Sequence, residues 1–262
     1  MVNRTSDPGK SEHLKQGVQL DIIYYTDPLC CWSWAMEAPL RRLMFEYDGQ
    51  IRWRYCQGGL LPAWTNYNDA INSVTRPLQM GPLWMHAQEV SGMPVDATIW
   101  KTDPPASSYP SCIAVKCAAL QSAEAGERYL RMVREAVMME AKNISQQQVL
   151  IDIATAFATK NICQFDIEKF KADLINGNGR EAFRKDLQEK QLSNIDRFPT
   201  LVIKSSSHHG IIVTGYRPYD ILHEAVLHVC PTLPKTNGDV TESKYISFWG
   251  NLTKREVEEI NR

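Results

Sequence analysis

The sequence predicts an α/β fold in which a large all-helical insertion interrupts a small β-α-β…β-β-α domain. Three observations lead to this prediction. A strand pattern, a helix pattern and a second strand pattern follow one another before residue 58. Residues 60–192 then carry helical periodicity with almost no strand pattern. Two further strand patterns and a helix pattern follow before residue 230. Strand, helix and strand in so short a span form a right-handed βαβ unit.

The first unit begins with an apolar run at residues 19–26, which predicts a strand buried on both faces. Residues 30–47 place apolar side chains at helical spacing. Pro39 inside this helix predicts a kink, because proline removes a backbone donor and clashes with the preceding turn. Residues 51–56 alternate between outward and inward side chains and predict the second strand.

The middle of the chain contains several amphipathic helix patterns separated by proline and glycine. Their apolar stripes need a surface to pack against, so we expect a compact helical subdomain and not an extended arm. The expected helices lie at residues 77–90, 110–120, 126–141, 145–157, 166–174 and 180–191.

Strand patterns return at residues 200–203 and 211–214, and Pro218 then opens a helix. Beyond Cys230 we expect a loosely attached tail with a short helix at 254–260. The predicted units are a flexible arm, a sheet domain in two pieces, the helical insertion and the tail, at residues 1–17, 18–59 with 193–230, 60–192 and 231–262. This order of elements is that of the thioredoxin fold with helices inserted after its second strand.

The composition is that of an ordinary globular protein, with 44% apolar and 23% charged residues. With a formal net charge of −1, the sequence lacks the excess positive charge expected of a protein that binds nucleic acid or an anionic membrane. Residues 1–17 lack the apolar segment of a signal peptide or a membrane anchor, so we expect a cytoplasmic protein. An odd count of seven cysteines then suggests reduced thiols, and no pair has the spacing and partner histidine of a metal site.

The most informative motif is Asp27-Pro28-Leu29-Cys30, which follows the first strand and opens its helix. The free N–H groups and the dipole of a helix N-terminus favour an anion. A cysteine there can have its pKa lowered by about a unit or more, so we predict that Cys30 is nucleophilic at neutral pH. A dithiol site would carry Cys-x-x-Cys, but Ser33 stands at the second cysteine position.

A second motif, Phe198-Pro199, directly precedes the third strand. Pro199 resembles the cis-proline of thioredoxin folds, which faces the reactive cysteine and offers backbone groups to a peptide or glutathione. We therefore predict a cis bond before Pro199, against the ordinary trans alternative. Phe198, Pro199 and Trp32 are the candidate binding residues for substrate or glutathione, although Trp32 has a core position as its alternative; Trp34 is expected in the core.

Residues 19–229 resemble the DsbA-like branch of thioredoxin-fold proteins, in particular cytoplasmic proteins of the FrnE and YjbH types. The resemblance rests on three stretches, at residues 27–34, 104–110 and 198–200. Many relatives look like Asp-Pro-Leu-Cys-x-Trp-Cys-Trp at the first stretch. Because Ser33 replaces the second cysteine here, the resemblance does not carry the family's dithiol redox cycle over to this chain.

The missing thiol limits the chemistry. After Cys30 attacks a disulfide, a mixed disulfide forms, and a second thiol normally displaces the product. Cys31 is the candidate resolving cysteine within the chain, although a disulfide between neighbours closes a strained ring. An external thiol such as glutathione is the other route. Ser33 keeps two candidate roles, because its hydroxyl can donate to the Cys30 thiolate or cap the helix.

These observations predict a thiol-disulfide oxidoreductase or isomerase that acts through the single nucleophile Cys30. We expect no tightly bound cofactor, glutathione as a co-substrate, and protein thiols or disulfides as partners. The resemblance leaves two alternatives open. YjbH-type relatives are similar to adaptors that present a substrate protein to a protease. Kappa-class glutathione transferases and chromene-carboxylate isomerases resemble this architecture but carry serine at the position of Cys30.

Overall fold

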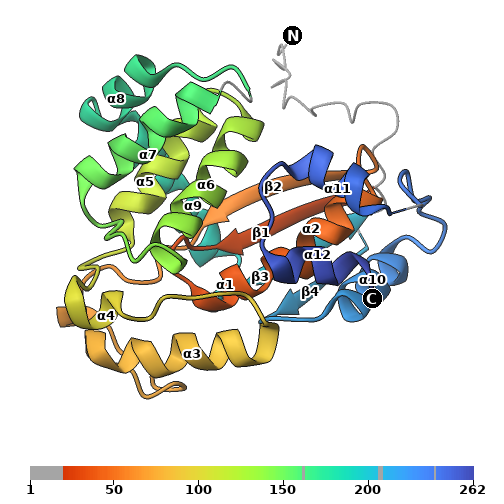
Figure 1. Cartoon of the computed structure of the whole chain (residues 1–262), viewed down its shortest axis with the longest axis horizontal. Helices are drawn as coiled ribbons and strands as arrows, with labels where there is room; N and C mark the ends of the chain where they lie inside the picture. Colours follow the sequence, from red (N-terminus) through yellow and green to blue (C-terminus); the bar gives the residue numbers. More distant parts are fainter. Residues whose placement is uncertain (1–19, 161–162, 206–208, 239) are drawn as a thin grey trace, which may run out of the picture.

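The computed structural model describes residues 20–160, 163–205, 209–238 and 240–262, so the arm predicted at residues 1–17 lies outside the described residues. A four-stranded mixed sheet lies at the centre of the fold (Figure 1). Its strands are β1 (Leu20–Thr26), β2 (Ile51–Gln57), β3 (Thr200–Ser205) and β4 (Gly210–Thr214).

The strand order of the sheet is β2-β1-β3-β4. β1 pairs in parallel with β2, so that Tyr24 lies opposite Tyr55. β1 and β3 are antiparallel, and so are β3 and β4. The parallel pair needs a crossover, and the antiparallel pair β3–β4 needs only a hairpin. This is the thioredoxin arrangement, and the predicted fold class is confirmed.

The crossover from β1 to β2 consists of two helices, α1 (Cys31–Ala35) and α2 (Glu37–Glu46). The prediction of one helix kinked at Pro39 is wrong, because the break lies earlier, at Met36. Pro39 occupies the first turn of α2, where a backbone N–H has no partner within the helix. The proline therefore fits the helix start without distorting it.

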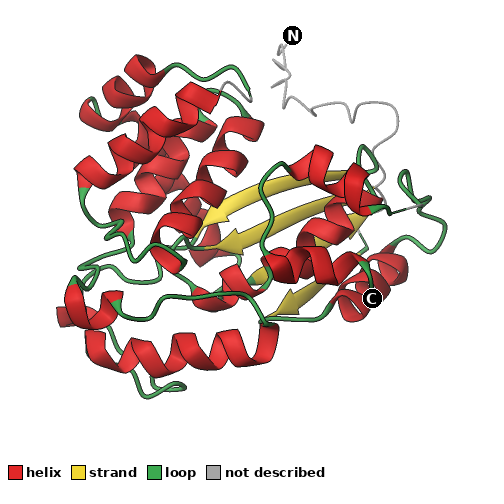
Figure 2. Ribbon diagram, in the orientation of Figure 1, coloured by secondary structure: helices red, strands yellow, loops and turns green. Residues whose placement is uncertain are grey.

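Between β2 and β3 the described residues form helices, apart from an isolated bridge between Asp69 and Val74. Figure 2 shows most of them as a bundle beyond the carboxyl ends of β1 and β2. The single turn α4 was not predicted, because one turn carries no periodicity. The segments are η1 (Trp64–Asn66), η2 (Pro77–Gln79), α3 (Met80–Ser91), α4 (Ile99–Thr102), α5 (Tyr109–Ala119), α6 (Ala123–Met138), α7 (Gln147–Lys160), α8 (Ile167–Ile175) and α9 (Asn178–Leu192).

The helical insertion and the sheet domain share their interior. The largest cluster of buried apolar side chains combines Leu29, Cys31 and Trp34 of the first strand–helix junction with residues of α3 to α8. Trp34 is fully buried in it. Burying a large apolar side chain contributes about 1.5–3 kcal/mol, so these contacts hold α1 firmly against the insertion. A second cluster packs α2 and α10 (Tyr219–Val229) on the sheet.

The C-terminal segment carries α11 (Glu242–Trp249) and α12 (Lys254–Ile260). The helix predicted at 254–260 is confirmed, but the prediction of loose attachment is wrong. α12 packs against α2, and Glu256 of α12 is fully buried. The charged sequence of α12 suggests a solvated helix, whereas Arg255, Glu256 and Glu259 are buried and form ion pairs inside the fold. No helix in the described part of the chain is long and apolar enough to span a lipid bilayer.

Candidate functional site

The end of β1 is fixed by the buried carboxylate of Asp27. Its Oδ1 accepts from the backbone N–H of Leu29 at 2.8 Å, and its Oδ2 accepts from the N–H of Leu60 at 2.7 Å and from the hydroxyl of Ser108 at 2.8 Å. Burial raises the pKa of Asp27, although these donors act to lower it. One side chain thus joins β1, the segment after β2 and the start of α5. Ser108 belongs to the block at residues 104–110, and its bond to Asp27 was not evident from the sequence.

Cys30 directly precedes α1 as its N-cap residue. Its thiol donates to the backbone carbonyl of Phe198 across a 3.6 Å distance, and the peptide bond between Phe198 and Pro199 is cis. The predicted cis-proline is therefore confirmed, and the structure brings it together with Cys30. Only 4% of the Cys30 surface is exposed.

The predicted lowering of the Cys30 pKa is wrong. Burial raises the pKa of the Cys30 thiol, and the carboxylate of Asp27 adds to the effect. The hydroxyl and backbone of Ser33 and the guanidinium of Arg134 act in the opposite direction but do not overcome the loss of hydration. Cys30 is therefore a thiol at neutral pH in this conformation. The position of Cys30 at a helix N-terminus predicts a thiolate. The sequence does not reveal that Cys30 is buried against the segment around Phe198, and this burial reverses the expected shift.

Ser33 is fully buried, and its hydroxyl has no hydrogen-bond partner among the described residues. It lies in the third position of α1 and makes no capping bond, so the alternative role as helix cap is wrong. An orphaned buried hydroxyl costs free energy. The other role considered for Ser33, donation to the Cys30 thiolate, stays a prediction.

Cys31 points into the apolar cluster shared by α1 and the insertion. Only 3% of its surface is exposed, and burial raises its pKa well above the ordinary value. Both Cys30 and Cys31 are free thiols. The resolving role of Cys31 stays a prediction, which this packing does not favour.

An aromatic rim lies beside the Cys30 site. The half-buried ring of Trp32 lies 5.6 Å from the exposed ring of His86 on α3 and 6.3 Å from the ring of Tyr216 after β4. Trp34, by contrast, is core, and its indole N–H donates to the carbonyl of Pro94 at 2.8 Å. His86 and Tyr216 are far from Trp32 in the sequence, and no local signal pointed to them.

The Phe198 ring rests on Gly58 at the end of β2. A Cβ at Gly58 would lie 1.9 Å from Cζ of Phe198, so any side chain there displaces the ring. We expect Gly58→Ala to lower the free energy of unfolding by about 1–3 kcal/mol, the usual cost of overpacking. Gly81→Ala is the matched control, because its Cβ meets nothing within 4 Å. Equal stability of the two variants in urea titrations would contradict this role of Gly58.

Arg134 of α6 links the helical insertion to the residues around Cys30. It is fully buried, forms an ion pair with Glu37 of α2 and donates to the hydroxyl of Thr26, the last residue of β1. Its charge acts to lower the pKa of Cys30. No motif marked Arg134 in the sequence, because an arginine on an amphipathic helix is normally solvated.

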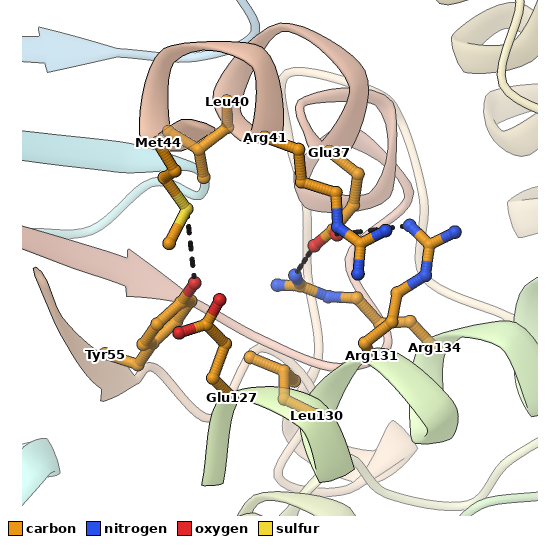
Figure 3. Close-up of a pocket in the computed structure, with 9 residues that line it drawn as sticks. All are labelled: Glu37, Leu40, Arg41, Met44, Tyr55, Glu127, Leu130, Arg131 and Arg134. Carbon is orange, nitrogen blue, oxygen red and sulfur yellow. Dashed lines mark hydrogen bonds and ion pairs between the residues drawn. The ribbon is translucent and has the colours of Figure 1, made fainter. Parts of the chain in front are cut away.

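The same ion pair belongs to a larger buried cluster (Figure 3). Arg131 donates to Glu37 at 3.2 Å and to both carboxylate oxygens of Glu256 at 2.9 and 2.8 Å. Arg41 also pairs with Glu256, at 3.1 Å. Burial acts to raise the pKa of Glu37, but the surrounding guanidinium groups hold it below its usual value. The cluster ties α2, α6 and α12 together.

A cysteine at the junction of the first strand and its helix, opposite a cis-proline, defines a thiol site of the thioredoxin class. A family model described as thioredoxin matches residues 24–224. The chain therefore belongs to the thioredoxin family. In the described residues, no group of three or more histidine, cysteine and acidic side chains is placed to hold a metal ion.

Two curated relatives carry the same name. The ClpXP adapter protein SpxH of Halalkalibacterium halodurans is 33% identical over 79% of this chain, and this chain spans 66% of its length. The protein of that name from Shouchella clausii is 29% identical over 95% of this chain and 80% of its own length. Among solved structures, the cytosolic disulfide reductase DsbM from Pseudomonas aeruginosa matches with a TM-score of 0.60 at 18% identity, covering 80% of this chain and 100% of that chain. At that identity the likeness shows the fold alone.

Proposed function

We propose that this protein is an adapter of the ClpXP type, which binds a substrate protein and presents it to the protease. Its thioredoxin-fold body is a binding surface, and Cys30 is not a turnover nucleophile. The observation that carries this proposal is the state of Cys30, a buried thiol with a raised pKa and no second cysteine at the Ser33 position. A cytoplasmic location is part of the proposal and agrees with the odd count of seven cysteines.

Two further observations support the adapter. The curated relatives described above are named as ClpXP adapters. The features that a thioredoxin fold uses for binding are present, although Ser33 stands at the position of the second cysteine. The peptide bond before Pro199 is cis, and Trp32, His86 and Tyr216 form an aromatic rim beside it. Aromatic side chains of this kind supply much of the energy at protein interfaces.

The test is the effect of the protein on the lifetimes of other proteins. We expect deletion in the source organism to prolong the half-lives of a small set of proteins, measured by pulse-chase mass spectrometry. Loss of the ClpX subunit should stabilise the same set. Wild-type protein and Cys30→Ser should both restore rapid turnover. Failure of a folded, normally abundant Cys30→Ser protein would contradict the proposal, as would an unchanged set of half-lives in the deletion strain.

A second candidate function is a monothiol reaction with glutathione, and the unpartnered Ser33 hydroxyl favours it. In this reaction the Cys30 thiolate attacks the glutathione sulfur of a glutathionylated substrate protein, a Cys30–glutathione disulfide forms, and the protein thiolate leaves. A glutathione thiolate then attacks the Cys30–glutathione disulfide, which releases oxidised glutathione and regenerates the Cys30 thiolate. Intact-mass analysis after exposure to oxidised glutathione tests this. A single adduct mapped to Cys30 supports the reaction, and its absence excludes it.

A further inference from the structure

A groove of about 200 Å³ lies between α6, α11 and the start of β2, apart from the residues of the Cys30 site. Pockets for drug-sized ligands occupy about 300–1,000 Å³, so this groove suits a single side-chain-sized group. Its lining combines apolar, aromatic and charged residues, namely Met44, Asp48, Gly49, Ile51, Trp53, Glu124, Glu127, Arg128, Phe248 and Trp249.

The charge of the groove is unbalanced. Its only lining cation among the described residues is Arg128, whose Nε lies 2.8 Å from Oε1 of Glu124. Asp48 and Glu127 have no ion pair with a described residue. The groove therefore presents two carboxylates without a cation of their own, beside three aromatic rings. Carboxylates and aromatic faces are both attractive to an organic cation.

Glu127 occupies a special position, because it lines both the groove and the small inner cavity next to the buried ion cluster. Figure 3 shows its carboxylate beside Tyr55, across that cavity from Glu37. Burial raises the pKa of Glu127 to about 7. The charged and titratable groups around it come from α2, the following turn, β2 and α6, and they are Glu37, Arg41, Asp48, Tyr55, Glu124, Arg128, Arg131 and Arg134.

The interior of the protein already binds a guanidinium in these surroundings. The guanidinium carbon of Arg41 lies 4.5 Å from the centre of the Trp249 ring, and the same group pairs with the carboxylates of Glu37 and Glu256. The groove offers the same combination from the solvent side, with the Glu127 carboxylate near Trp53 and Trp249. The free acceptor and the ring faces match one further guanidinium.

We propose that this groove binds an arginine side chain of a partner protein, with Glu127 as the acceptor and the rings of Trp53, Phe248 and Trp249 as its walls. The guanidinium replaces the proton that Glu127 holds near neutral pH, so binding releases a proton. The proposal goes beyond the adapter function and does not use Cys30.

The test is calorimetric titration of the full chain with Nα-acetyl-arginine amide, and with the neutral isostere Nα-acetyl-citrulline amide as control. We expect binding of the arginine probe and at least about tenfold weaker binding of citrulline. Between pH 6 and pH 8 the ionised fraction of Glu127 rises from about a tenth to about nine tenths, so the affinity should rise about tenfold.

Two variants on α6 should act in opposite directions. Glu127→Gln should weaken binding about tenfold and remove its pH dependence, whereas Arg128→Gln should tighten binding because it removes a repelling cation. Misfolding cannot explain a gain of affinity, so the second variant keeps the test valid if the first is unstable. Cys30→Ser should bind unchanged, which separates this result from the fate of the adapter proposal.

Several outcomes would overturn the proposal. They are no binding of the arginine probe at millimolar concentration, equal binding of citrulline, or affinities that neither α6 variant changes. Tighter binding of agmatine than of the capped arginine would indicate that the groove binds a small molecule with a free amine. The proposal of a partner protein would then be wrong.

Discussion

Replacing Glu256 by alanine should lower the free energy of unfolding by about 3–5 kcal/mol, the cost of removing one partner from a buried ion pair. Glu256 is fully buried and accepts hydrogen bonds from both Arg41 and Arg131. Without it, these two guanidinium groups stay buried with only part of their charge compensated. Urea titrations followed by circular dichroism measure the loss.

Lys254→Ala in the same helix is the control, because the Lys254 side chain is 92% exposed and should contribute less than about 0.5 kcal/mol. The effect of Glu256 should also depend on pH. Burial acts to raise the pKa of Glu256, but Arg131 and Arg41 hold it below its usual value. Its contribution is therefore present above the unfolded-state pKa of about 4.3 and is lost as the pH falls through the folded-state value. A similar loss in both variants would contradict the ion cluster's role in holding α12.

Replacing Asp27 by alanine should lower the free energy of unfolding by about 3 kcal/mol or more. The N–H groups of Leu29 and Leu60 and the hydroxyl of Ser108 would lose their acceptor. Each buried donor left unsatisfied costs about 1–3 kcal/mol, and relief of the buried carboxylate offsets part of the sum. Chemical denaturation of the purified variant provides the measurement.

Asp27→Asn separates hydrogen bonding from charge, because the amide keeps one acceptor oxygen. We expect it to lose about half as much stability as Asp27→Ala. Ser108→Ala, which removes one donor and leaves the backbone bonds intact, should cost about 1 kcal/mol. If all three variants were as stable as the wild-type protein, Asp27 would not hold the end of β1.

Local patterns predicted the elements of this fold well. Alternation and apolar runs located all four strands, and the short helix expected at residues 254–260 is present. The position of Cys30 before α1 and the cis bond at Pro199 followed from the order of the elements. These features depend on residues close together in the chain or on a topology that few orders of elements allow.

Properties that depend on contacts between residues far apart in the chain could not be predicted from the sequence. The raised pKa of Cys30 comes from burial at the junction of α1 and the Phe198 loop, which lie 168 positions apart. The attachment of α12 depends on arginines of α2 and α6 that look like solvated charges in the sequence. A pattern along one segment reports which face is apolar, and it does not report which charged partners will be buried with that segment.

The central claim is that Cys30 is a buried, protonated thiol at neutral pH and not an activated nucleophile. The most direct test is the rate of Cys30 alkylation by iodoacetamide between pH 6 and pH 10, followed by peptide mass spectrometry. We predict that Cys30 reacts more slowly at pH 7 than an unhindered model thiol, and that its rate still rises above pH 9. A rate that levels off below pH 7, with Cys30 the fastest of the seven cysteines, would contradict the claim.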